Sequence, residues 1–452
     1  MLNPHLLPGP RSAIIERPFM SLTASLSRRE FVASTAAVAA ASSILPNAFA
    51  RFGARDDAGG RLKIGVIGCG GRGTGAAVDA LSASPDIQIW ALGDAFPDRL
   101  SGARSELTKT DNNFGDRVQV PDDRCFSGFD AYKKVLASGV DCVILATPPG
   151  FRPLHFAAAI EAGKHVFFEK PVAVDAAGIR TVLEAARKAT EKKLSVVNGS
   201  QRRHEKCYLE AVQRVQDGAI GKVLSASVYW NQGGLWMHKR ADHPNWSDTE
   251  WQLRNWLYFT WLSGDHITEQ HVHNLDVAHW FMDETPKSVA SMGGRQVRTS
   301  PDYGHVFDHF ACDFEYAEGR TVKSQCRQID GCNSRVEEVI HGTEGRAVLR
   351  SGFAQIHGKG AWKFTGEQTN PYEQEHKDLV ASITGKGPYL NEAERIAKST
   401  LMAIMGRMSA YTGKSVTWEQ AMNSKLDLVP ATIELGSMAV PEVAVPGKTL
   451  LI

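Results

Sequence analysis

The stretch GDHITEQHVHNLD, residues 264–276, carries three histidines, two aspartates and one glutamate. Glu269, His273 and Asp276 recur at i, i+4 and i+7, so they share one face if the stretch is helical. A carboxylate one turn from a histidine can orient the ring and raise its proton affinity, as a general base near neutral pH requires. The spacing therefore predicts acid–base chemistry by His273, with Glu269 beside it.

Two other interpretations of this stretch compete with acid–base chemistry. Four of its side chains can bind metals: His266, Glu269, His271 and His273. No three of them project from one helical face with the spacing of a zinc-binding helix, so we expect no metal. A polar helix start with satisfied histidines stays open as the bland alternative. We assign His271 and Asp276 to contact with substrate.

A glycine loop near residue 70 predicts a dinucleotide site. The segment RLKIGVIGCGGRGTGAAVDAL is a β-branched run, a glycine turn and a helix, in that order. Gly68, Gly70 and Gly73 form G-x-G-x-x-G, in which the glycines allow the tight turn, the approach of a pyrophosphate and close helix–strand packing. The helix N-terminus adds N–H groups and a positive dipole.

The next expected strand, DIQIWALGDA, ends in Asp94. A carboxylate at this place accepts both ribose hydroxyls of NAD. Arg99 lies close enough in the sequence to keep NADP open, and a carboxylate that merely faces water is the bland alternative. We expect NAD.

Alternating strands and helices continue to about residue 200. VDCVILATPPG is an apolar strand that ends at Thr147 and Pro148, KHVFFEKP is another strand, and KLSVVNGSQRR supplies one more. This alternation predicts a doubly wound parallel sheet, at whose carboxyl edge a nicotinamide would sit.

The motif Glu169-Lys170-Pro171, placed after a complete dinucleotide fold, resembles the Gfo/Idh/MocA family of glucose–fructose oxidoreductase and inositol dehydrogenase. The Thr147-Pro148 turn with His155 downstream matches the family as well. So do DGAIGKVLSASVYW, where the second domain opens, and VIHGTEGRAVL within its sheet. The resemblance covers nearly all of the chain after its first 50 residues.

The resemblance implies an N-terminal Rossmann domain and a C-terminal α/β domain with a large open, mainly antiparallel sheet. It gives Lys170 contact with the reacting hydroxyl and the nicotinamide ribose, and His273 the acid–base role. This chain has Glu269 where the family commonly has aspartate, and one glycine, Gly264, where the family usually has three. Motifs and resemblance together assign the cofactor-binding set: Gly68, Gly70, Arg72, Gly73, Asp94, Thr147, Pro148, His155, Glu169 and Lys170.

Tryptophans crowd residues 230–280, where the loop NQGGLWMHKRADHPNW is glycine-rich, polar and aromatic. Aromatic faces beside polar groups suit a polyhydroxylated ring, so we expect Trp236 on the pocket wall, although core packing explains most of the tryptophans. Arg203, at the handover between the domains, is a further candidate substrate contact, with a solvated turn as the equal alternative.

The N-terminus is typical of an export signal. Arg28 and Arg29 precede an alanine-rich run that ends in Ala48-Phe49-Ala50. This pattern predicts a twin-arginine signal, a mature chain from near Arg51 and a periplasmic location. We expect four parts: the signal 1–50, the Rossmann domain 61–200, the substrate and oligomerisation domain 201–430, and a tail 431–452.

The composition limits the classes of partner that we expect. The 452 residues carry a formal charge of +1, which predicts neither a nucleic acid nor a membrane surface as partner. Seven scattered cysteines without a Cys-x-x-Cys pair argue against a disulfide framework and a structural zinc site. The resemblance to the family implies a homo-oligomer, a dimer or tetramer.

Three functions remain open at this stage. The leading hypothesis is an NAD(P)-dependent oxidoreductase that acts on the CH–OH group of a sugar, inositol or related polyol. Because no free nicotinamide pool is expected in the periplasm, the cofactor would be tightly bound. That leads to an alternative, an exported NAD-dependent glycosidase or lyase that oxidises a sugar carbon transiently. A non-catalytic sugar-binding protein is the third.

Overall fold

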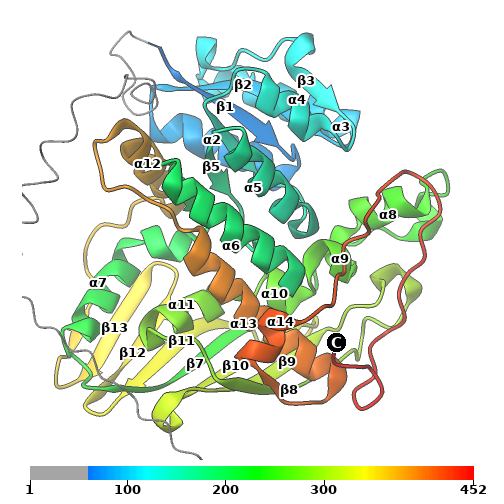
Figure 1. Ribbon diagram of the computed structural model, residues 1–452. Coiled ribbons are helices and arrows are strands. Elements are labelled where there is room, and N and C mark those ends of the chain that lie inside the picture. The colour runs from blue at the N-terminus through cyan, green and yellow to red at the C-terminus, as the bar shows by residue number, and fades with distance from the viewer. Residues whose placement is uncertain (1–59) are drawn as a thin grey trace, which may run out of the picture. The chain divides into compact units, whose positions relative to one another are not determined.

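The computed structural model describes residues 60–452, which contain a six-stranded and a nine-stranded sheet (Figure 1). The predicted twin-arginine signal and its cleavage site lie outside the described residues. None of the described helices is long and apolar enough to cross a bilayer.

The six-stranded sheet is parallel throughout and has the order β3-β2-β1-β4-β5-β6. Its strands are β1 Leu62–Ile67, β2 Ile87–Asp94, β3 Cys125–Ser127, β4 Cys142–Leu145, β5 His165–Phe168 and β6 Val196–Asn198. Its helices are α2 Gly71–Ala83, α3 Pro97–Leu107, α4 Ala131–Ala137, α5 Arg152–Glu161 and α6 Ala176–Glu191. Every residue of β4 is buried, as expected for a strand covered on both faces. The predicted Rossmann fold is confirmed.

The nine-stranded sheet is antiparallel except where β10 pairs with β7, and its order is β14-β13-β12-β11-β7-β10-β9-β8-β15. Its strands are β7 Val223–Gln232, β8 Ser288–Gly294, β9 His309–Glu315, β10 Thr321–Gln328, β11 Arg335–Gly342, β12 Gly345–Arg350, β13 Phe353–Gly358, β14 Trp362–Lys363 and β15 Val416–Thr417. The remaining helices are α7 Lys206–Gln216, α8 Asp248–Arg254, α9 Thr260–Ser263, α10 His266–Glu269, α11 Val272–Met282, α12 Pro371–Thr384, α13 Ala393–Thr412 and α14 Trp418–Asn423. This mainly antiparallel sheet is the one expected for the second domain.

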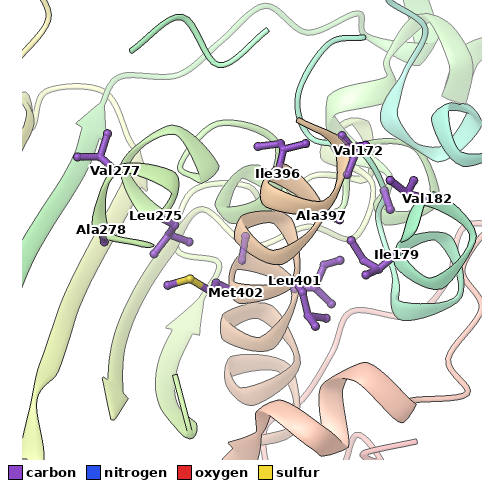
Figure 2. Packing of buried hydrophobic residues seen from close by; sticks show 14 of the residues in the cluster. Val172, Ile179, Val182, Leu275, Val277, Ala278, Ile396, Ala397, Leu401 and Met402 are labelled. Carbon is purple, nitrogen blue, oxygen red and sulfur yellow. The ribbon is translucent and has the colours of Figure 1, made fainter. Parts of the chain in front are cut away.

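Helix α13 joins the two halves of the fold. Figure 2 shows Ile396 and Leu401 of α13 among side chains from the α6 side, such as Ile179, and from α11, such as Leu275. Sixteen of its 20 residues are buried, so the apolar stripe expected from the sequence extends around most of the helix. A helix that is buried on nearly all sides fixes the nucleotide-binding sheet against the elements that carry the histidine-rich stretch.

Residues 233–263, which we call the aromatic insertion, connect β7 to α10 and contain α8 and α9. They build a separate apolar cluster around Trp251, Phe259 and Trp261. Three phenylalanines from the carboxyl ends of β2, β3 and β4 pack against this cluster, namely Phe96, Phe129 and Phe151. The insertion therefore lies against the nucleotide-binding edge of the parallel sheet.

Candidate active site

The loop between β1 and α2 has the geometry of a pyrophosphate cradle. Gly68 has a φ of +94°, which a side chain rarely tolerates. A Cβ on Gly73 would lie 1.8 Å from the carbonyl oxygen of Gly68, whereas a Cβ on Gly70 would meet nothing within 4 Å. The open space therefore faces the side from which a phosphate can approach the unpaired N–H groups at the start of α2. These residues fit a dinucleotide.

Asp94 closes β2 and is held by two backbone donors. Its Oδ2 accepts from the Cys69 N–H at 2.7 Å and its Oδ1 accepts from the Phe96 N–H at 2.9 Å. Burial raises the pKa of the carboxyl above its usual value, against the effect of these two bonds. Each oxygen keeps a lone pair, so the carboxylate can still accept from the two hydroxyls of a ribose.

Two buried side chains, His155 and Arg152, contact the turn that follows β4. The Thr147 hydroxyl lies 3.3 Å from His155 Nδ1, and burial lowers the pKa of that histidine to about 3. Arg152, which the sequence analysis missed, donates through Nη1 to the Pro171 carbonyl at 2.5 Å and through Nη2 to the Thr147 carbonyl. A buried guanidinium therefore ties the Thr147-Pro148 turn to the turn that follows Lys170.

Glu169 and Arg72 are bound to each other. Arg72 Nε donates to Glu169 Oε1 at 2.6 Å, and Arg72 Nη2 donates to Asp79 at 3.1 Å. The charge of Arg72 is thus already neutralised by two carboxylates. Its predicted role in cofactor binding remains a prediction, and the pair with Glu169 links the glycine loop to the Glu169-Lys170-Pro171 motif.

Lys170 and Glu269 meet across the two halves of the fold. Lys170 Nζ donates to the Glu269 carbonyl at 2.6 Å and to Glu269 Oε1 at 3.0 Å. The exposed fractions of the two side chains are 12% and 10%, so the pair is largely screened from water. An ammonium with two acceptors keeps a third N–H, which can be donated to a substrate oxygen.

His273 lies four residues after Glu269, near the start of α11, and has a different partner from the one we predicted. Its ring stacks on Trp230, with the ring centroids 5.5 Å apart and 23° between the planes. Within residues 60–452 its side chain makes no hydrogen bond, and 8% of the residue is exposed. Both ring nitrogens are therefore available for a substrate hydroxyl.

The predicted effect of Glu269 on His273 is wrong. The Glu269 carboxylate pairs with Lys170, and burial, then the charges of Lys170 and Arg202, hold the pKa of His273 well below its usual value. The ring is neutral at physiological pH, which is the form that can accept a proton.

The histidine-rich stretch is not one helix. Helix α10 ends at Glu269 and α11 begins at Val272. His271 lies between them, fully buried, with Nδ1 3.2 Å from Asn274 Oδ1 and Nε2 2.7 Å from Ser324 Oγ. With no exposed surface and both ring nitrogens engaged, His271 has no atom left for a substrate, which argues against its predicted contact.

Arg203 and Asp276 also have their polar atoms bound by other residues of the protein. Arg203 donates to Asp276 Oδ2 at 2.8 Å and to Oδ1 at 3.0 Å, and Ser399 Oγ donates to Oδ1 at 2.7 Å. Against the effect of burial, Arg203 and Arg395 hold the pKa of Asp276 far below its usual value. These contacts join α11 to α13 and to the turn after β6, so they argue against the predicted substrate contacts of Arg203 and Asp276.

Asp265 and His266 anchor the start of the stretch. Asp265 has a φ of +70°, unusual for a residue with a side chain. Its Oδ2 accepts from Tyr411 at 2.6 Å and from the Phe307 N–H at 2.8 Å, and Oδ1 lies 3.1 Å from His266 Nδ1. No group of three or more His, Cys, Asp or Glu side chains in the described part of the chain is placed to hold a metal ion.

The aromatic insertion binds the segment that follows Asp94. Arg254 of α8 donates to the two carboxylate oxygens of Asp98 at 2.7 and 3.0 Å, and its guanidinium lies 4.0 Å from the ring centroid of Phe96. The insertion also packs closely on the turn after β4, where a Cβ on Gly150 would lie 2.1 Å from the Trp261 carbonyl oxygen. Trp236 is 46% exposed on the outer part of the insertion, and its predicted substrate contact remains a prediction.

The comparisons with known proteins agree with this geometry. Residues 62–197 match the family model "Oxidoreductase family, NAD-binding Rossmann fold", and residues 208–348 match "GFO/IDH/MocA C-terminal domain". The chain belongs to the GFO/IDH/MocA family of oxidoreductases. The expected family and fold class are thereby confirmed.

Individual relatives of this family member are distant. It is 25% identical to inositol 2-dehydrogenase of Acidothermus cellulolyticus, over 71% of this chain and 81% of that protein. It is 27% identical to glycosyl hydrolase family 109 protein 1 of Bacteroides fragilis, over 50% of this chain and 47% of that protein. Its fold resembles the crystal structure of levoglucosan dehydrogenase in complex with NADH and levoglucosan, with a TM-score of 0.60, 20% identity, and coverage of 79% and 99%. The glycosidase alternative is not favoured, because its match covers less of the chain.

Proposed function

We propose that this protein is an NAD-dependent dehydrogenase that acts on a carbinol carbon of a sugar, inositol or related polyol. One observation carries the proposal: Lys170 Nζ, fixed 3.0 Å from Glu269 Oε1, lies at the carboxyl edge of the nucleotide-binding sheet, where its charge acts on the ring of His273, which makes no hydrogen bond within residues 60–452. The names of the relatives, which include an inositol and a levoglucosan dehydrogenase, support this substrate class.

The residues divide the chemistry of alcohol oxidation between them. Bound NAD would supply the acceptor for the hydride, the carbon-bound hydrogen with its two electrons. Lys170 donates a hydrogen bond to the substrate oxygen and stabilises the negative charge that develops on it. His273, neutral because of its low pKa, accepts the hydroxyl proton. Glu269 holds the ammonium of Lys170 in place.

Two features support a preference for NAD and its retention between turnovers. The Asp94 carboxylate suits a ribose diol and would repel the 2′-phosphate of NADP. The aromatic insertion contacts both Phe96, which follows the strand end expected to hold the adenosine ribose, and Phe151, which follows the strand end expected to lie by the nicotinamide. An insertion held there by Arg254 would slow the departure of the cofactor.

The proposal includes export and assembly. Arg28, Arg29 and the Ala48-Phe49-Ala50 site support export of the folded protein by the twin-arginine route to the periplasm, with its cofactor already bound. The open face of the nine-stranded sheet, on which Lys323 and Gln325 of β10 are exposed, is the surface that we assign to contact within a homo-oligomer.

The test is direct. The purified chain is assayed for absorbance at 340 nm with added NAD and a panel of inositols, aldoses, anhydrosugars and aryl glycosides. We expect at least one equivalent of NADH per chain to form with at least one alcohol, and the Lys170→Met variant to lose this activity while it still binds NAD. A chain that binds no NAD, or that releases aglycone without any redox change, contradicts the proposal. Arg187→Met, on the exposed side of α6, is the matched control.

A further inference from the structure

Two polar side chains lie on the covered face of the nine-stranded sheet beneath α11, one on each side of a valine. In the register of the strands, Ser324 of β10 and Glu338 of β11 both lie opposite Val228 of β7. All three are buried, Glu338 completely. Buried polar groups in the middle of a sheet cost stability unless they are partnered, so their partners identify what they hold.

The partners are the residues that surround His273. Ser324 Oγ lies 2.7 Å from His271 Nε2, and Glu338 Oε1 accepts from Asn274 Nδ2 at 2.6 Å. The same amide donates to the Tyr229 carbonyl at 3.0 Å. Residues on both sides of His273 are therefore fastened to three adjacent strands, while its own ring makes no hydrogen bond to the part of the chain that the structure describes.

Arg202, in the turn after β6, supplies the counter-charge. Its Nη1 donates to Glu338 Oε1, and Tyr208 donates to Oε2 at 2.8 Å. The side chains of Arg202 and Glu338 are 4% and 0% exposed. The guanidinium lies 5.3 Å from the ring centroid of Trp230, the ring on which His273 stacks. One indole ring thus contacts both the cation and the imidazole.

We propose that Arg202 and Glu338 form a buried ion pair that positions His273, through Trp230 and Asn274, and sets the charge that the imidazole experiences. The proposal rests on the proposed function only in naming His273 as the proton acceptor. Neither residue touches substrate, so both are positioning residues.

Charged groups reach His273 from each neighbouring element. Lys170 lies after β5, Arg202 lies on η5 (Gln201–His204), and Asp276 and His271 lie on its own segment. Glu269 on α10 is paired with Lys170. The two cations favour the neutral ring and Asp276 favours the charged one. Loss of Arg202 therefore favours protonation of His273, whereas loss of Glu338 leaves the cation uncompensated and disfavours it.

The test titrates His273 itself and needs no substrate. The full chain is labelled with ¹³C-histidine, and the His273 signal is assigned by its absence in His273→Asn. We expect the protonation midpoint to rise in Arg202→Met, by roughly half to one on the pH scale. In Glu338→Gln it does not rise. Tyr208→Phe, which removes a hydrogen bond without changing charge, leaves the midpoint where it is.

The outcomes separate positioning by charge from simple loosening of the core. Entry of water would raise the midpoint in both Arg202→Met and Glu338→Gln, and an equal rise in both overturns the proposal. So does an unchanged midpoint in Arg202→Met. If Arg202→Met does not fold, Arg202→Gln, which keeps a donor for Glu338, must give the same rise. Because the titration measures no turnover, its failure is distinct from failure of the proposed function.

Discussion

Arg254→Met removes the contact by which the aromatic insertion holds the segment after Asp94. Arg254 makes two hydrogen bonds to Asp98, at 2.7 and 3.0 Å, and lies 4.0 Å from the ring centroid of Phe96. Methionine keeps most of the side-chain volume and loses the charge. We expect the insertion to open more often, so that bound NAD leaves faster.

The magnitude follows from the geometry. Asp98 is 58% exposed, so the ion pair contributes only about 0.5–1 kcal/mol. The cation–π contact with Phe96 adds about 0.5–1 kcal/mol. A total of about 1–2 kcal/mol corresponds to a roughly 5–30-fold faster release of cofactor, if the contact breaks before NAD departs.

Release is measured by mixing the NADH-loaded protein with excess NAD and following the loss of NADH fluorescence. The control is Arg187→Met, which removes a two-carboxylate ion pair on the exposed side of α6, away from the nucleotide edge. Equal release rates in the wild type, Arg254→Met and the control would refute the role of the insertion in retention.

Three further predictions concern residues that shape the site or support the elements around it. Gly73→Ala places a Cβ 1.8 Å from a carbonyl oxygen of the glycine loop, and we expect NAD affinity to fall at least about tenfold in a fluorescence titration. Gly150→Ala places a Cβ 2.1 Å from the Trp261 carbonyl oxygen, so the free energy of unfolding measured in denaturant falls by about 1–3 kcal/mol. Although burial opposes it, contact with Asp378 and a second carboxylate raises the pKa of His204 to about 10. Its stabilisation is complete below a pH of about 6.5 and is lost as the pH rises towards 10, a dependence that Asp378→Asn reduces in thermal unfolding.

Local patterns predicted the nucleotide-binding half well. The glycine loop and the strand that ends at Asp94 are determined by neighbouring residues, because a tight turn and a buried parallel strand each demand particular side chains. The alternation of strands and helices likewise predicted the parallel sheet.

The histidine-rich stretch shows what local patterns cannot supply. Helical spacing placed Glu269, His273 and Asp276 on one face, but the break between α10 and α11 separates them. The partners that decide their roles, Lys170 for Glu269 and Arg203 for Asp276, are far away in the sequence. Burial decided the state of His273, and no spacing rule shows how deeply a ring is buried.

Arginines that join distant segments were missed for the same reason. Arg152 and Arg254 each act through a contact between distant segments. A charged residue inside the apolar start of α5 was the one sequence signal that could have identified Arg152. Nothing in the sequence around Arg254 indicates that α8 packs against the segment after β2.

The central claim is that the neutral ring of His273 accepts the proton of an alcohol held by Lys170. The most direct test is the single-turnover rate of NAD reduction in His273→Asn, measured by stopped-flow absorbance at 340 nm with an alcohol that the wild type oxidises. We expect the rate to fall by about 10²–10⁴-fold with NAD affinity unchanged. A rate within a few fold of the wild type, at full NAD occupancy, would contradict the account.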